Sequence, residues 1–136
     1  MRFIKSIPLF AYLWVLYNVL MVGGDMQETL AAGLFGVTLP SDAEWILSIA
    51  DLFTLVGVVA LYIEIFKSTR TGVSSILDHT LSMGVFILFL VEFIVVPGAG
   101  TSPFFILTMM SLLDVIAGYT ISISAARRDF QIGPGE

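Results

Sequence analysis

The sequence predicts an all-α fold, an integral membrane four-helix bundle with short loops except for a first outer loop of about 20 residues. Composition is the first reason, because 57% of the 136 residues are apolar and only 12% are charged. The second is a series of long apolar stretches. The third is that every lysine and arginine flanks these stretches, in three pairs: Arg2 and Lys5, Lys67 and Arg70, and Arg127 and Arg128. Two crossings between successive pairs keep all cations on one side, so both termini are expected in the cytoplasm.

The expected spans, which make up a single domain over residues 1–136, cover about residues 7–24, 45–66, 76–97 and 103–126. The first span follows Arg2 and Lys5 and ends at Gly23-Gly24. A cleaved signal peptide would have a similar charged start. No small-x-small cleavage site follows, however, so we expect this span to be retained.

The connection from Gly23 to Glu44 is the only long one. Its middle, residues 30–39, is apolar but too short to cross a bilayer, so we expect it to lie on the outer interface or to cover the mouth of the bundle. Gly33 and Gly36 leave a re-entrant segment as the alternative.

Serine-led patterns with the chemistry of a helix start precede the other spans: Ser41-x-x-Glu44, Ser75-x-x-Asp78 and Ser102-Pro103. Residues 71–72 and 97–100 contain glycine and proline breakers. These breakers make the second and third connections short, so the spans that they join are expected to be antiparallel.

Polar side chains at depth are the candidate functional residues. Counted at about 1.5 Å per residue from each span's centre, Asp114 lies near the midplane, with Asn18, Asp51 and Glu92 roughly 5 to 10 Å outward of it. The candidate ion, proton or buried polar layer comprises Asp114, Glu92, Asp51, Asn18, Ser111 and Thr54. Three other polar residues, Glu64, Asp78 and His79, are expected near the cytoplasmic interface.

The last span carries a stripe of small and polar residues at helical spacing: Thr108, Ser111, Asp114, Gly118, Ser122 and Ala125. We expect this stripe to face protein. Gly118 and Ser122 form a small-xxx-small pair, which permits close helix packing within the bundle or against another copy.

No lysine, arginine or histidine lies at the depth of the polar layer, so an ionised carboxylate there would be costly. Protonated acids could bond to Asn18, Ser111 or Thr54 and hold the helices together. Alternatively, the acids could bind a cation or relay protons, or they could pair with a basic group on a partner. Four acids in the outer loop would concentrate cations there: Asp25, Glu28, Asp42 and Glu44.

Enzymatic function is the least favoured class. Cysteine is absent, His79 is the only histidine, and no metal-ligand spacing such as His-x-x-x-His occurs. We therefore expect no catalytic residue, metal site or cofactor. No basic patch favours binding of nucleic acid.

The sequence favours a non-enzymatic membrane protein that works through assembly, because a chain that is nearly all membrane helix has little surface for soluble chemistry. It would be a homo-oligomer or an accessory subunit of a larger membrane complex, and its partners would be the lipid bilayer and either itself or a larger membrane protein. The alternative is a small proton- or cation-linked transporter or channel that uses Asp114, Glu92 and Asp51, with Asn18 as a neutral ligand. The expected location is a bacterial-type inner (plasma) membrane.

Overall fold

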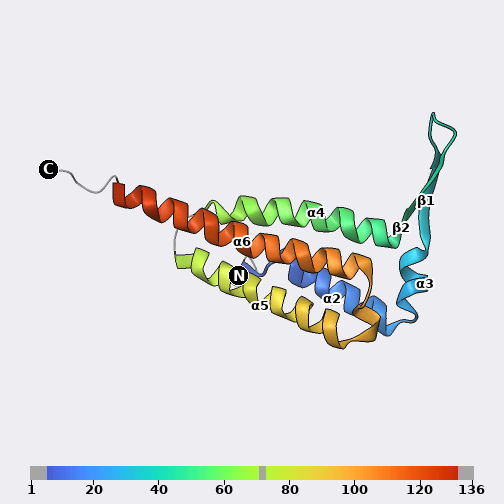
Figure 1. Cartoon of the computed structure of the whole chain (residues 1–136), viewed down its shortest axis with the longest axis horizontal. Coiled ribbons are helices and arrows are strands. Elements are labelled where there is room, and N and C mark those ends of the chain that lie inside the picture. Colours follow the sequence, from blue (N-terminus) through green and yellow to red (C-terminus); the bar gives the residue numbers. More distant parts are fainter. Residues whose placement is uncertain (1–5, 71–72, 132–136) are drawn as a thin grey trace.

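The computed structural model describes residues 6–70 and 73–131, apart from the side chains of residues 73, 74 and 129. The described chain is mostly helical, with five α-helices, one 3₁₀ helix and a two-stranded antiparallel sheet (Figure 1). Arg2, Lys5 and the breaker at residues 71–72 lie outside the described residues.

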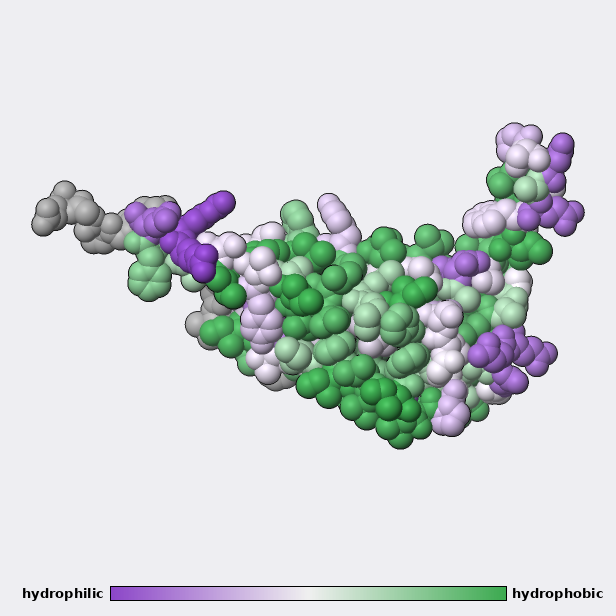
Figure 2. Space-filling model, in the orientation of Figure 1, coloured by the Kyte–Doolittle hydropathy of each residue, from purple (hydrophilic) through white to green (hydrophobic). Residues whose placement is uncertain are grey.

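The three longest helices are α4 (Ile49–Ser68), α5 (Val73–Val95) and α6 (Ser102–Gln131). They contain 20, 23 and 30 residues, so at about 1.5 Å per residue each is at least as long as the ~30 Å hydrocarbon core of a bilayer. Figure 2 shows hydrophobic side chains over the middle of the helices and hydrophilic ones toward the two ends of the molecule. The prediction of membrane-compatible helices is confirmed for these three, which are long and apolar enough to cross a membrane.

Helix α2 (Leu9–Val22) is the counterpart of the first expected span and is shorter than predicted. Its 14 residues rise about 21 Å, less than the hydrocarbon thickness. Pro8, in an extended conformation, occupies the N-cap position and sets the start, while Gly23 is the C-cap. A membrane crossing by the first expected span, residues 7–24, therefore stays a prediction.

One aromatic cluster joins α2 to the three long helices. The ring of Tyr17 on α2 packs edge-on against Phe53 on α4, with centroids 5.5 Å apart, and against Phe104 on α6, at 4.7 Å. Phe89 on α5 lies 5.1 Å from Phe104. Tyr17, Phe89 and Phe104 are fully buried, so all four helices contribute to one core.

Helix α6 is the central element of this arrangement. It packs along both α4 and α5, whereas direct contacts between α4 and α5 are sparse among the described residues. At Gly57 on α4 a Cβ atom would lie only 2.7 Å from Leu107 of α6, so this glycine allows the two helices to approach closely. Helix α2 contacts both α4 and α5.

The connection between α2 and α4 contains a short helix, α3 (Met26–Ala31), and a hairpin of β1 (Gly33–Thr38) and β2 (Glu44–Ser48). The hairpin leaves the end of the helices at a steep angle and projects to one side of them (Figure 1). Every residue of β1 is exposed, so this segment does not enter the bundle as a re-entrant loop would. Asp42 in the turn adopts a left-handed φ of 62°, which aspartate tolerates better than most residues.

The structure shifts all three of the predicted helix starts. Residues 45–48 belong to β2, and α4 begins at Ile49 after a capping box made by Ser48 and Asp51, not by Ser41 and Glu44. Helix α5 begins at Val73, so Ser75 lies inside its first turn and bonds to His79 instead of capping the helix. At α6 the hydroxyl of Thr101 accepts from the backbone N–H of Phe104 at 3.4 Å, one residue before the serine that was expected to cap.

Candidate functional site

The six side chains predicted to form one polar layer lie in three separate environments. Among the described residues, Asp51 and Thr54 bond only to the N-cap or the first turn of their own helix, α4. The carboxylate oxygen Oδ2 of Asp51 accepts from the backbone N–H of Ser48 at 2.9 Å and from its hydroxyl at 2.8 Å. Thr54 donates to the carbonyl of Ala50 at 3.1 Å. Asp51 is exposed at the start of its helix, so the structure places it outside any buried layer.

Asn18 and Glu92 are brought together across α2 and α5. The Asn18 amide donates to Oε2 of Glu92 at 3.2 Å and to the carbonyl of Trp14 at 3.0 Å. Glu92 is 8% exposed, and its other oxygen, Oε1, is buried without a hydrogen-bond partner among the described residues. The indole Nε1 of Trp14 is also buried and lacks a partner in the described part of the chain.

Tyr17 fixes the same end of α2 to the connection between α5 and α6. Its hydroxyl lies 2.6 Å from the Thr101 hydroxyl and donates to the carbonyl of Gly98, in the 3₁₀ helix η1 (Pro97–Ala99), at 3.2 Å. These bonds satisfy the buried phenol. They also keep Asn18, one residue further along, facing α5.

Asp114 lies at a different level of the bundle, on α6. Its side chain is buried and lies near Ser82 of α5, which is buried as well. Ser82 and Glu92 are ten residues apart on α5, which corresponds to about 15 Å of helix rise. Asp114 and Glu92 therefore do not share a layer. Ser111, one turn before Asp114, is buried as well.

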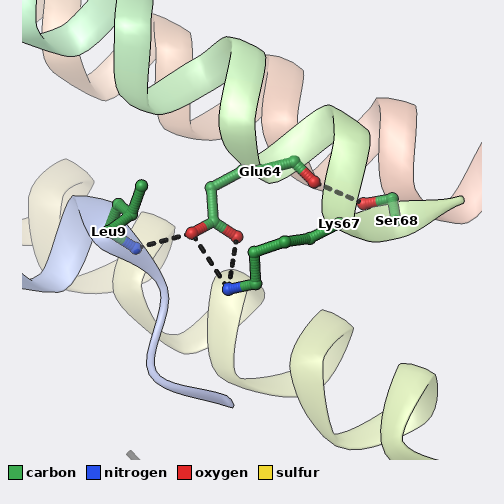
Figure 3. Close-up of polar contacts among 4 residues, drawn as sticks. All are labelled: Leu9, Glu64, Lys67 and Ser68. Carbon is green, nitrogen blue, oxygen red and sulfur yellow. Dashed lines mark hydrogen bonds and ion pairs between the residues drawn. The ribbon is translucent and has the colours of Figure 1, made fainter. Parts of the chain in front are cut away.

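Glu64 was expected at the interface, and the structure buries it instead, with 5% of its surface exposed. Its Oε1 accepts from the backbone N–H of Leu9 at 2.8 Å, and Lys67 donates to both carboxylate oxygens at 3.2 Å (Figure 3). The Leu9 N–H is one of the unpaired donors at the start of α2. A carboxylate there is favoured by the helix dipole, so Glu64 caps α2 from another helix. The Glu64–Lys67 spacing is visible in the sequence, but the contact with Leu9 is not.

His79 was also expected at the interface and is buried between α5 and α6. Its Nε2 lies 2.7 Å from the hydroxyl of Ser122 and 3.1 Å from that of Ser75. A Cβ atom on Gly118 would lie 2.6 Å from the imidazole Nδ1, so the ring occupies the space that this glycine leaves. Gly118 and Ser122, predicted as a helix-packing pair, thus receive a side chain of the same molecule.

Charge is separated along the molecule. Lys67 and Arg70 lie near the end of α4, and Arg127 and Arg128 lie near the end of α6, at the same end of the helices (Figure 1). The acids of the connection between α2 and α4 lie at the opposite end, with the hairpin and α3: Asp25, Glu28, Asp42 and Glu44.

Among residues 6–70 and 73–131, no three histidine, aspartate or glutamate side chains gather as a potential metal site. No protein-family model matches the chain, and neither a curated protein nor a solved structure matches it.

Proposed function

We propose that the chain is a non-enzymatic membrane protein that acts through assembly, as a homo-oligomer or as an accessory subunit of a larger membrane complex. The observation that carries this proposal is the projecting hairpin. Its register pairs Val37 with Trp45 and Phe35 with Leu47. Directly opposed residues share a face of a two-stranded sheet, so these four apolar side chains lie on one face.

The opposite face of the hairpin is smaller and more polar, with Gly36 opposite Ile46 and Thr38 opposite Glu44. An isolated two-stranded hairpin is marginally stable, and its outer edges carry unpaired backbone donors and acceptors. Phe35 and Trp45 on the apolar face are 59% and 45% exposed. A partner that covers this face would supply the burial that the hairpin lacks within the chain.

The proposed topology has four crossings, with α2 as the first and both termini on the cytoplasmic side of a bacterial-type inner membrane. The shared aromatic core and the Glu64 cap support α2 as a member of the bundle. The positions of Lys67, Arg70, Arg127 and Arg128 at one end of the helices support the orientation.

Substitution of Trp45 tests the assembly proposal, with Ile46 on the other face as the matched control. We expect native mass spectrometry of the gently extracted wild-type chain to show a defined oligomer or a stoichiometric larger partner. Trp45→Ser should shift most of the protein to the free chain, because it removes the largest apolar side chain from the proposed contact face. Ile46→Ser should keep the association, and circular dichroism should show equal helix content in all three proteins.

Two results would contradict this proposal. One is a wild-type chain that is free and single under gentle extraction. The other is an association that Trp45→Ser and Ile46→Ser weaken equally.

A proton- or cation-linked transporter is the second candidate, and the Asn18–Glu92 pair is the observation that favours it. Glu92 offers a buried oxygen without a partner among the described residues, as a proton-binding group requires. The separation of Asp51, Glu92 and Asp114 leaves this candidate without the continuous layer that the sequence suggested. Proton uptake by liposomes that contain the wild-type chain, and its loss in Glu92→Gln, would favour transport over assembly.

A further inference from the structure

A pocket of about 320 Å³ opens between the end of α4, the start of α5 and the last turns of α6. Arg70, Ser75, His79, Tyr119 and Ser122 are among its lining residues. The pocket lies beyond the aromatic core, at the end of the helices where Lys67, Arg127 and Arg128 are also found.

The charge of the pocket is opposite to that of the chain. The sequence holds 11 acidic residues against six lysines and arginines. Yet the described residues that line the pocket include Arg70 and no aspartate or glutamate. Such a lining favours an anion, and a guanidinium can bind two oxygens of a phosphate at once.

Two hydroxyl groups beside His79 supply the pocket with hydrogen-bond donors in addition to Arg70. Ser75 and Ser122 both lie within hydrogen-bond distance of the imidazole Nε2, from α5 and α6 respectively. A hydroxyl has one donor and two acceptor positions, so with the ring proton on Nε2 the two serines can accept from the imidazole and still donate to a bound oxygen. His79 is 7% exposed and packed against Gly118, which fixes the ring that positions them.

The outer side of the pocket is apolar. Ile76 and Tyr119 line it and are 68% and 43% exposed on the outer surface of α5 and α6. A ligand with an anionic head and a hydrocarbon tail would therefore place its head beside Arg70 and its tail along the apolar faces of α5 and α6. Basic pockets between membrane helices bind the headgroups of anionic lipids in this way.

We propose that this pocket binds the phosphate-bearing headgroup of an anionic phospholipid. The inference rests on the proposed membrane location of the chain and is independent of its assembly role. Arg70 binds the phosphate, Ser75 and Ser122 donate to its oxygens, and His79 positions the two serines.

The test compares lipid retention by the full-length chain and two arginine variants. Each purified protein is exchanged into micelles that contain equal amounts of phosphatidylglycerol and phosphatidylcholine with the same acyl chains, and bound lipid is counted by native mass spectrometry. We expect wild type to retain phosphatidylglycerol preferentially. Arg70→Gln should reduce this preference about fivefold, the factor that corresponds to ~1 kcal/mol for one arginine at an anionic surface. Arg128→Gln, which changes an exposed arginine outside the pocket lining, should leave the preference unchanged.

Several outcomes would overturn the inference. They are equal retention of the two lipids by wild type, or equal losses in Arg70→Gln and Arg128→Gln. A third is Arg70-dependent binding of inorganic phosphate, measured by calorimetry, without any preference for phosphatidylglycerol, because it would identify a site for free phosphate. Lipid retention is measured on the chain itself, so failure of the assembly proposal would not alter this result.

Discussion

Asp51 shows at the scale of a residue how a small error in a helix boundary changes the meaning of a side chain. The expected span began at residue 45, which placed Asp51 nearly two turns inside the membrane. The helix begins at Ile49, so Asp51 lies in the first turn and completes a capping box with Ser48. The sequence contains both Ser41-x-x-Glu44 and Ser48-x-x-Asp51, and local chemistry alone does not choose between them. Strand pairing of residues 44–48 with β1 decides the choice.

Removal of the Ser48 cap should destabilise the protein, whereas removal of the Ser41 hydroxyl should not. Ser48→Ala removes the hydroxyl that accepts from the Asp51 N–H and donates to its carboxylate, so we expect a loss of about 1 kcal/mol in unfolding free energy. Ser41→Ala, in the turn of the hairpin, is the matched control and should change stability little. Unfolding by increasing SDS in mixed micelles, followed by circular dichroism, measures both. A larger loss in Ser41→Ala would show that α4 begins before Ile49.

Asn18 and Glu92 were predicted at similar depth, and the structure joins them, because hydropathy sets depth well when the flanking breakers are clear. Burial of Glu64 and His79 was not predictable from depth alone. Glu64 is buried because the start of α2 packs on it, and His79 because Gly118 leaves space for its ring. Both depend on which helices are neighbours, and sequence periodicity does not determine that.

At the scale of an element, the small and polar stripe on α6 packs against other helices of the same chain. Thr108, Ser111 and Asp114 are buried, and Gly118 and Ser122 receive His79 of α5. The sequence predicted a protein-facing stripe from its spacing but left open whether another copy would cover it. In the structure, α5 of the same chain covers the part of the stripe around Gly118 and Ser122.

Substitution of Gly118 should therefore act on folding. In Gly118→Ala the new Cβ atom would lie 2.6 Å from Nδ1 and 2.8 Å from Cε1 of His79, whose planar ring cannot bend away. We expect destabilisation of about 1–3 kcal/mol through displacement of the ring from Ser122. Gly84→Ala on α5 is the control, since a Cβ atom there meets nothing within 4 Å, and it should be neutral or slightly stabilising. Thermal unfolding in detergent compares the two variants, and equal melting temperatures would refute the close contact.

At the scale of the whole molecule, the number of crossings is the property that composition and charge predict and that helix length alone does not establish. Helices α4, α5 and α6 are long enough to cross, whereas α2 rises only about 21 Å. A short helix can still cross if the bilayer thins locally or if flanking residues extend its reach. The two possibilities place the N-terminus on opposite sides.

Reporter fusions distinguish four crossings from three. We expect a fluorescent protein that folds only in the cytoplasm to be active at both the N- and the C-terminus, because four crossings return the chain to its starting side. Alkaline phosphatase, active only outside the cytoplasm, should be active when it is inserted in the hairpin turn near Ser41. If the fluorescent protein is active at only one of the two termini, α2 does not cross.

The central position of α6 has a consequence for how the chain matures. Helices α4 and α5 precede α6 in the sequence and have few contacts with each other among the described residues. The imidazole of His79 on α5 lies 2.7 Å from the hydroxyl of Ser122 on α6, and Ser82 of α5 lies near Asp114 of α6. During synthesis the two earlier helices would therefore remain loosely associated in the bilayer, without the contacts that α6 later gives to His79 and Ser82. The last helix is the one that completes the fold, and a nascent chain that stalls before Ser102 would present those groups to the cell's quality-control machinery.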